Sequence, residues 1–519
     1  MGASELGYRA AKVLGRIFLM LALLLAVVFA AMALLTELLP IRIMVLLLAA
    51  EALALLLAAL LTWEPSHVVR FVIGILFSAV LCMGFVLGTG FIYRALTTAR
   101  IVTTVRTETA SMGIYMRAED TRDFAEIEES CLYGILAVQD RDNTDAAIAD
   151  ITRNYGFTPQ VQEYSGLPLL LDGLFSSQVD AVILNSAYLG LFEEMAGYED
   201  AASRLRQVRV ATVERQVEET VAEPDPETEG EKAERLTGRT RSQAVDEAEA
   251  SVEEEQQGMI FTVYLSGNDT RGSLQGKSRS DVNILAAVNT ATHQIVLIST
   301  PRDYYVPLSI SGGAKDKLTH AGIYGVDVSM ETLAMLYHVN VDYYFRVNFT
   351  GFEDIIDALG GVNVPVESTF TSTDGYTFYQ GVNYMDGAAA LSFVRERNAF
   401  PSGDRQRGKN QMVLIRAVID KCISPEMLLR YNEVLSAIEG CFEGSMSYEM
   451  LSTLVREQLD TGGAWNVVTY SVDGTGSSQV PWSLSQSAYV MIPDEDTLNT
   501  ARGLIYQVYT GQVVTDPYG

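Results

Sequence analysis

The sequence has 519 residues, 48% of them hydrophobic, and a formal net charge of -28 at pH 7. This length suffices for two or three domains with sizeable cores. Binding to a nucleic-acid backbone requires a basic footprint, so the acidic balance argues against nucleic acid as a partner. Any polyanionic ligand must therefore be held by a local basic patch.

Three long apolar segments lie near the N-terminus, at residues 17–36, 41–62 and 71–92. Each has about the 20 residues that a helix needs to cross ~30 Å of hydrocarbon. A signal peptide would not be followed by two further segments of this kind. The basic residues before the first segment predict a cytoplasmic N-terminus. We therefore expect residues 1–99 to cross the lipid bilayer three times and the rest of the chain to lie outside the cell membrane.

Residues 100–213 have the pattern of a small α/β domain. Strands are expected at 133–139, 158–164 and 179–185, with a helix at 144–156. The order strand–helix–strand–helix–strand predicts a parallel sheet. This stretch resembles one lobe of a periplasmic solute-binding protein. Because a lone lobe lacks the second wall of a cleft, the pattern favours a structural or docking role over ligand capture.

The composition changes at residues 214–257, which contain fifteen acidic residues, five basic residues and no aromatic residue. Such a segment cannot bury enough apolar surface to fold. We interpret it as a flexible acidic linker. Residues 258–519 alternate strands and helices and form the part that we expect to carry the chemistry.

Three successive apolar strands are predicted in this last part, at 260–265, 282–288 and 295–300, with Asp269 after the first, Asp281 at the start of the second and Arg302 after the third. If these strands are antiparallel neighbours, Asp269, Asp281 and Arg302 meet at one edge of the sheet. Each charge taken alone is better explained as a solvated turn residue, so the prediction rests on their convergence. Two carboxylates suit Mg²⁺, which prefers oxygen ligands and keeps waters and substrate phosphates in its shell. The adjacent arginine suits a phosphate group.

A cluster of five basic residues occurs in "SFVRERNAFPSGDRQRGKNQ", residues 392–411. A helix is expected from about residue 386 into a loop near Asn398. Arg395 and Arg397 are two residues apart, so a continuing helix would direct them to different faces. Both can reach one ligand if the helix ends there.

A second helix is expected to begin at Asp404. The spacing of Asp404, Arg407 and Gln411 places them on one helix face. Arg405 and Lys409 point elsewhere and are interpreted as ordinary surface charge. Without the residues at the sheet edge, the whole cluster would be better explained as a solvated arginine-rich turn.

Cysteines are few, and no C-x-x-C pair is present, which argues against zinc and thioredoxin-type sites. Cys422 and Cys441 either form a disulfide outside the cell or are two buried thiols. The sequence does not favour one alternative over the other.

The pattern of this last part resembles the LytR-CpsA-Psr family of cell-envelope proteins. The matching motifs occur in the family's order and cover about residues 258–421: "SGNDTRG", "SRSDVNILAAVN", "ISTPRDYYVPL", "KLTHAGIYG", "VDYYFRVNFTGFEDIIDALGGVNVPV", "GVNYMDGAAALSFVRER" and "GDRQRGKNQ". The three apolar segments also fit the family. The insert at 100–213 departs from its simplest members.

The resemblance implies an α/β fold with a mixed central sheet flanked by helices and an apolar groove for a lipid tail. It also implies a phosphotransferase that moves a glycan, with one phosphate, from a polyprenyl-pyrophosphate carrier to peptidoglycan. Asp269 and Asp281 would then hold Mg²⁺. The pyrophosphate would be bound by six side chains: Arg302, Lys317, Arg395, Arg397, Arg407 and Gln411. The reaction itself would depend on Asp281, Arg395, Arg397 and Asp404.

Two points about these roles stay open. Asp404 could orient the arginines or assist deprotonation of the acceptor hydroxyl, and its basic neighbours favour the former because they lower a carboxyl pKa. The apolar stripe of Leu414, Ile415 and Val418 is either a wall for the lipid tail or plain core. Alternative functions are a lipid-pyrophosphate phosphatase, which passes the phosphoryl group to water, and a non-enzymatic envelope regulator.

Overall fold

A computed structural model describes residues 3–35, 41–63, 68–103, 107–127, 130–216, 258–268, 278–401, 403–422, 424 and 442–517. These residues form two compact units, which are described separately. The predicted linker lies outside the described residues apart from its first three positions, and so do Asp269 and Cys441. Cys422 is a free, exposed thiol.

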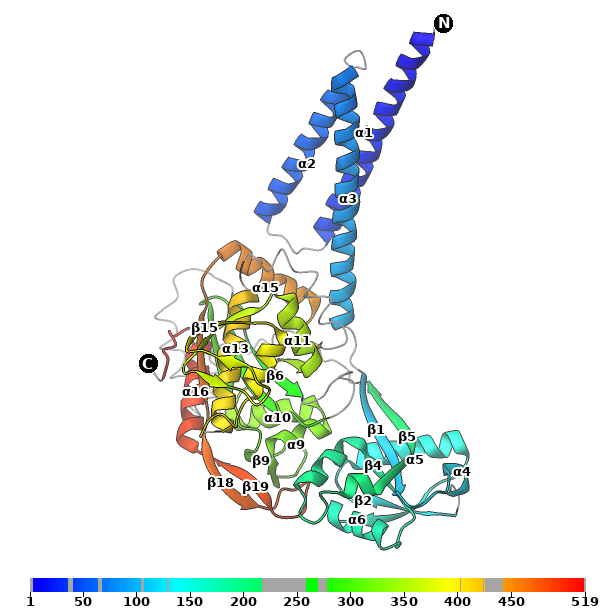
Figure 1. Cartoon of the computed structure of the whole chain (residues 1–519), viewed down its shortest axis with the longest axis vertical. Coiled ribbons are helices and arrows are strands. Elements are labelled where there is room, and N and C mark those ends of the chain that lie inside the picture. Colours follow the sequence, from blue (N-terminus) through cyan, green and yellow to red (C-terminus); the bar gives the residue numbers. More distant parts are fainter. Residues whose placement is uncertain are drawn as a thin grey trace, which may run out of the picture. The chain divides into compact units, whose positions relative to one another are not determined.

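The first unit contains the helices α1 (Ala3–Leu35), α2 (Ile41–Thr62), α3 (Val68–Thr103) and α15 (Tyr448–Thr461) (Figure 1). In the described part of the chain, three helices are long and apolar enough to cross a membrane: Lys12–Leu34, Met44–Thr62 and Val68–Gly90. A Cβ atom at Gly74 of α3 would lie 2.8 Å from Leu61 of α2. Glycine therefore permits the close approach of these two helices, as small residues do in membrane bundles. The three predicted spans are confirmed as helices.

The second unit begins with a small α/β domain, built on a five-stranded sheet in the order β3-β2-β4-β1-β5. Its strands are β1 (Thr107–Arg117), β2 (Leu132–Leu136), β3 (Gln160–Tyr164), β4 (Ala181–Asn185) and β5 (Leu205–Gln216). Its helices are α4 (Phe124–Ile127), α5 (Arg141–Tyr155), α6 (Leu167–Phe175) and the 3₁₀ segments η1 (Ser186–Glu194) and η2 (Ala201–Arg204). The predicted parallel pairing holds for β2 with β3 and β4. The long antiparallel strands β1 and β5 were not predicted.

A mixed six-stranded sheet forms the centre of the rest of the unit, in the order β16-β11-β6-β7-β8-β17. Its strands are β6 (Ile260–Asn268), β7 (Val282–Asn289), β8 (Gln294–Ser299), β11 (Tyr343–Asn348), β16 (Phe442–Gly444) and β17 (Asn466–Ser471). As predicted, β6, β7 and β8 are antiparallel neighbours. Strands β11 and β17 are added in parallel to β6 and β8.

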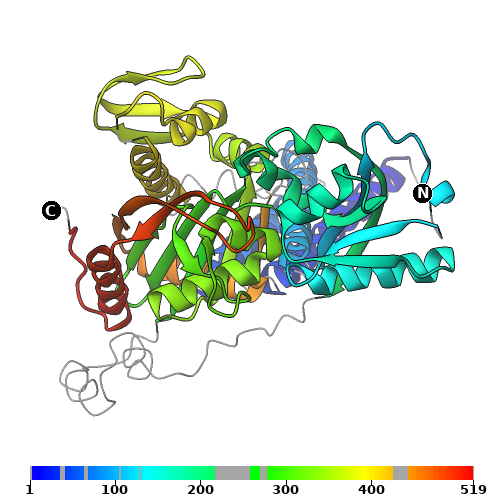
Figure 2. The ribbon, with the colours of Figure 1, turned by 90° about the horizontal axis from the view of Figure 1, so that it is seen from below.

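Helices cover both faces of this sheet because successive side chains of a strand point to opposite faces. Leu285 and Ala287 of β7 pack in the core of one face, under α9 (Leu318–Tyr324), α10 (Val326–Tyr337) and α16 (Glu495–Tyr509). Ile284 and Ala286 pack on the other face with residues of α13 (Asp404–Cys422). Figure 2 shows α13 and α16 on opposite sides of the green central strands. The mixed central sheet flanked by helices is confirmed.

Shorter elements complete the part of the unit that contains this six-stranded sheet. A lobe beside α13 has its own core and contains α11 (Phe349–Ala358), β12 (Val362–Val366), β13 (Phe370–Thr371), β14 (Thr377–Phe378), β15 (Gly381–Met385) and α12 (Gly387–Arg395). Two further hairpins are formed by β9 (Tyr305–Pro307) with β10 (Lys315–Lys317) and by β18 (Gly474–Gln479) with β19 (Ala488–Pro493).

The small α/β domain and the part with the six-stranded sheet share one hydrophobic core. Leu191 of η1 and Leu484, which follows the β18 strand, are both completely buried in it. Tyr188 donates a hydrogen bond to Tyr324 of α9 at 3.0 Å, and their rings meet edge to face. The small domain is therefore a docked module.

Candidate active site

One edge of the six-stranded sheet collects the charged residues that the sequence analysis singled out. The backbone N–H of Asp281 donates to Gly267 at the end of β6, at 2.9 Å. Arg302, just after β8, donates to Asp281 Oδ1 at 2.8 Å. The predicted convergence of Asp281 and Arg302 is confirmed. Asp269, which follows β6 directly, lies outside the described residues.

Arg395 is brought to the same edge through α11. Strand β11 runs parallel to β6, with Asn348 opposite Asn268, so the start of α11 lies where β6 ends. The guanidinium carbon of Arg395 lies 4.5 Å from the centre of the Phe349 ring at that point. A cation over an aromatic face is stabilised electrostatically, which holds Arg395 near the sheet edge.

Helix α12 ends at Arg395, three residues before the loop expected near Asn398, because Glu396 has an extended backbone. The side chain of Glu396 is buried and accepts hydrogen bonds from the backbone of Thr373, at 2.6 Å, and of Ala399, at 2.8 Å. Burial raises the pKa of Glu396, but these hydrogen bonds outweigh it and lower the pKa. Arg395 and Arg397 on either side are exposed. Glu396 thus anchors the turn and leaves both guanidinium groups available to a ligand, a role that sequence reasoning missed.

Helix α13 begins at Asp404, as predicted, and passes over the end of β8. A Cβ atom at Gly408 would lie 3.6 Å from Ser299 Oγ, the last residue of that strand. Arg407 and Gln411 are half-buried on this part of the helix. The side chain of Asp404 is outside the described part of the chain.

The two residues interpreted as surface charge are exposed. Arg405 pairs with Asp473 Oδ1 at 2.7 Å, and Asp473 is not one of the predicted site residues. Lys409 lies on the same helix and is also solvent-exposed, as expected of a surface charge.

Lys317 lies at the edge too, but in an unexpected environment. Its ammonium group is 2.5 Å from Glu194 of the small α/β domain and 3.5 Å from Asp303. Asp303 in turn lies 3.7 Å from the Nε atom of Arg302. Glu194 was missed because it belongs to another domain, and no local sequence signal pairs it with Lys317.

The chemistry of Asp281 fits one ligand of a Mg²⁺ ion, since the carboxylate lies at an open sheet edge beside an arginine suited to phosphate. Among the described residues, no group of three or more His, Cys, Asp or Glu side chains could hold a metal by themselves. The second predicted ligand, Asp269, falls outside that part. A Mg²⁺ ion bound here would therefore depend on water and substrate oxygens as well.

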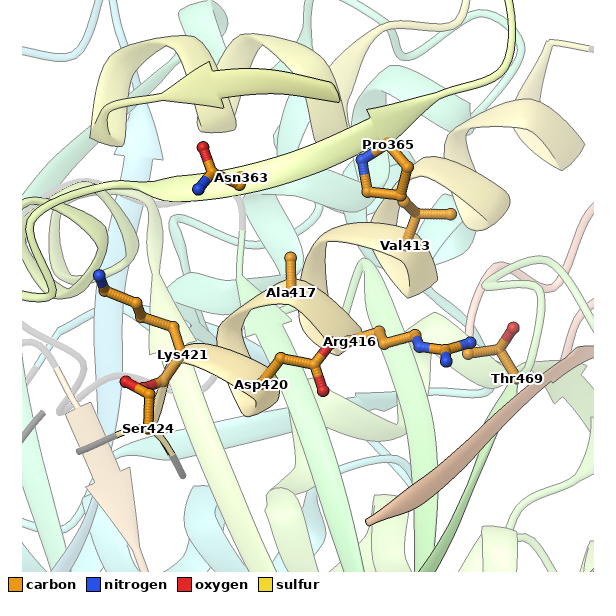
Figure 3. A pocket seen from close by; sticks show the side chains of 9 residues that line it. All are labelled: Asn363, Pro365, Val413, Arg416, Ala417, Asp420, Lys421, Ser424 and Thr469. Carbon is orange, nitrogen blue, oxygen red and sulfur yellow. The ribbon is translucent and has the colours of Figure 1, made fainter. Parts of the chain in front are cut away.

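A crevice of about 770 Å³ runs beside α13, between β12 and β17 (Figure 3). Pro365, Val413 and Ala417 provide an apolar wall, whereas Arg416 and Asp420 add charge. The apolar stripe predicted on α13 does not line it: Leu414 is completely buried in the core of the lobe, and Ile415 packs against the sheet. The stripe is core, which was one of the two alternatives.

The model of the LytR_cpsA_psr family matches residues 225–502, more than half of the chain. The chain belongs to this family. The matched range includes every predicted site residue.

Curated relatives within the LytR-CpsA-Psr family are similar to a little less than half of this chain. One is the polyisoprenyl-teichoic acid–peptidoglycan teichoic acid transferase TagU of Oceanobacillus iheyensis, 32% identical over 45% of this chain and 72% of its own. The protein of the same name from Bacillus anthracis is 32% identical over 46% of this chain and 78% of its own. The crystal structure of B. subtilis TagV covers 49% of this chain and 98% of its own, at 24% identity and a TM-score of 0.41.

Proposed function

We propose that this protein is a membrane-anchored transferase that moves a phosphoglycan from a polyprenyl-pyrophosphate carrier to peptidoglycan. The observation that carries the proposal is the meeting of Asp281 and Arg302 at the sheet edge, with Arg395 held over Phe349 at that edge. Family membership makes the protein a phosphotransferase of the cell envelope. Relatives named as teichoic acid transferases support teichoic acid, or a similar envelope polymer such as a capsule, as the group transferred.

The charges at the edge suit a pyrophosphate diester. Phosphoryl transfer depends mainly on positioning and on neutralising charge on the phosphate oxygens. Exposed Arg395 and Arg397 would bind the phosphates first, and Arg302 would then align them against Asp281. Arg407, Gln411 and Lys317 complete the proposed pyrophosphate ligands, and Asp404 would orient the arginines.

Mg²⁺ is proposed as the cofactor, held by Asp281 and Asp269. When bound, it would supply positive charge that stabilises the phosphate oxygens during transfer. The ion pair with Arg302, 2.8 Å long, orients Asp281 at the edge.

The crevice beside α13 is the proposed path of the polyprenyl chain. Its apolar wall begins two residues after Gln411, a proposed pyrophosphate ligand, so a tail could enter it directly from the site. Ala417→Trp would fill the crevice. We expect it to weaken binding of a long polyprenyl pyrophosphate and to leave binding of inorganic pyrophosphate unchanged; equal weakening of both would assign the crevice another role.

The substrate's lipid carrier also explains the membrane helices. Anchoring in the bilayer raises the effective concentration of a lipid-linked donor at the site. The proposal places the N-terminus in the cytoplasm and the catalytic domain outside. The test is a reporter that works only in the cytoplasm, fused at residue 300. Activity of this reporter would contradict the proposed topology.

The transferase proposal is tested with the full-length protein in liposomes that contain a labelled polyprenyl-pyrophosphate glycan, with peptidoglycan as acceptor. We expect label in peptidoglycan. Label that appears only as free phosphoglycan would instead show a phosphatase, and unchanged donor under all conditions would favour a non-enzymatic regulator.

A further inference from the structure

In the described part of the chain, Glu194 is the only residue of the small α/β domain that forms an ion pair with a predicted site residue, Lys317. Strand β4 is buried along its whole length and leads directly into η1, whose first turn is capped by the side chain of Asn185. Tyr188, Leu191 and Phe192 anchor η1 in the shared core. Glu194 is the last residue of η1, so its position follows from that anchoring.

The docking surface of the small domain lies at the carboxyl ends of its parallel strands. There, Gln139 donates to the carbonyl oxygen of Trp482 at 3.3 Å. A Cβ atom at Gly166 would lie 2.7 Å from Ser485 Oγ, so the Gly166 backbone lies very close to the Ser485 side chain. In open α/β sheets this end of the strands is where ligands bind. Here the catalytic domain occupies it, which brings η1 against the active site.

Glu194 is held by three groups of the catalytic domain. Arg279 donates to Oε1 at 2.7 Å, and Lys317 donates to Oε2 at 2.5 Å. His320 is completely buried, with Nδ1 bonded to Asp316 at 2.7 Å and Nε2 at 3.9 Å from Glu194. The whole arrangement is only partly open to solvent, since 21% of the Glu194 side chain and 6% of the Lys317 side chain are exposed.

A chain of charges with alternating sign connects Glu194 to the proposed transfer site. Its members, in spatial order, are Arg279, Glu194, Lys317, Asp303, Arg302 and Asp281. Successive members are 2.5 to 3.7 Å apart. Side chains that share one network of ion pairs are energetically coupled, so a change at one end alters the geometry at the other.

We propose that Glu194 is a positioning residue of the transfer site, supplied by the small α/β domain. The carboxylate of Glu194 neutralises the ammonium group of Lys317. Asp303 is then available to pair with Arg302, and this pairing keeps the Arg302 guanidinium directed at Asp281. The inference rests on the proposed function for the substrate, a polyprenyl pyrophosphate. It gives the inserted domain a role in the reaction that a docked module alone would not have.

The test is a double-mutant cycle of Glu194→Gln and Arg302→Lys in the full-length, detergent-solubilised protein. Each variant is measured for its dissociation constant for farnesyl pyrophosphate, and for kcat and KM in transfer. Glu193→Gln is the matched control, because Glu193 is the exposed neighbour of Glu194. Glu194→Asp is the second variant, since it keeps the charge.

We expect Glu194→Gln to weaken farnesyl pyrophosphate binding and to lower kcat/KM by roughly tenfold, since small displacements of aligned groups reduce rates strongly. In the Arg302→Lys background the same change should have less than about a twofold effect, as expected of coupled residues. Glu194→Asp should recover part of the loss, and Glu193→Gln should behave as wild type.

Other outcomes would overturn the inference. Additive effects in the two backgrounds would mean that Glu194 acts independently of Arg302, as a purely structural residue would. Higher affinity or activity in Glu194→Gln would mean that Glu194 competes with phosphate for Lys317. The proposed function fails separately: a wild-type protein that binds farnesyl pyrophosphate and shows the coupling, but transfers no glycan, would retain the positioning role and lose the transferase role.

Discussion

The six-stranded sheet and the five-stranded sheet use comparable edges for different purposes. At the ends of β6, β8 and β11 the chain places charged side chains, with Arg302 and Asp281 partly exposed. At the ends of β2 and β4 it places Leu136, Tyr188 and other apolar side chains, which are buried against the catalytic domain. Both edges gather residues from loops that a rigid sheet positions.

The difference shows that topology alone does not decide what a strand end does. In the first sheet the loop residues are cations and carboxylates, which suit a charged ligand. In the second, aromatic and aliphatic residues make the edge a surface for another domain. Glu194 is the point where the two edges meet, because it belongs to the second and pairs with charges of the first.

The largest effect is expected from removing the exposed arginines of the catalytic edge. Arg395→Ala or Arg397→Ala should lower transfer by at least about a hundredfold, the loss typical of one charge-stabilising group. Neither change should alter the unfolding temperature by more than a degree or two, since the two side chains are exposed and contribute little to the core. The measurement is transfer in liposomes together with thermal unfolding.

Arg405→Ala is the matched control for these variants. Arg405 is also exposed, but it pairs with Asp473, which is not one of the predicted site residues. A loss of transfer in Arg405→Ala as large as that in Arg397→Ala would show that general surface charge, and not the arrangement at the edge, binds the substrate.

The next effect concerns the metal. Chelation with EDTA should reduce transfer about a hundredfold, and added Mg²⁺ should restore it, because the phosphate oxygens would lose their compensating charge. Asp281→Asn should raise the Mg²⁺ concentration needed for half-maximal activity. Full activity in EDTA would mean that transfer does not require Mg²⁺ and that basic side chains alone compensate the charge of the phosphates.

The docking edge is tested by Leu484→Ala. Leu484 is completely buried in the shared core, so truncation should destabilise the protein by about 2–5 kcal/mol. Hydrogen exchange should become faster in η1 and α9 before it does so in β7. Val480→Ala is the control, because Val480 in the same segment is 54% exposed. Equal protection of η1 in both variants would mean that the two domains do not depend on this contact.

The sequence allowed much of the catalytic edge to be predicted, because its signals are local. Alternating apolar residues located β7, and α12 and the start of α13 were expected close to where they lie. The order of β6, β7 and β8 then brought Asp281 and Arg302 together. The pairing of Lys317 with Glu194 could not be predicted, since the two residues are 123 positions apart and meet only through domain docking. Strands β1 and β5 were missed for the same reason: their pairing is non-local.

The smallest effect is the pH dependence of docking through Glu194. Burial raises the pKa of Glu194, but the neighbouring His320 and the two cations outweigh it and lower the pKa below its ordinary value. The folded state therefore holds fewer protons than the unfolded state near pH ~4.3, the usual value for a glutamate. The stabilisation is complete above that pH and is lost as the pH falls through the folded-state pKa. Unfolding free energies of wild type and Glu194→Gln should differ most at neutral pH and converge in acid, whereas Glu193→Gln should follow wild type throughout. A difference that stays constant with pH would mean that the contact depends on the shape of Glu194 and not on its charge, and the two edges would then be joined by packing alone.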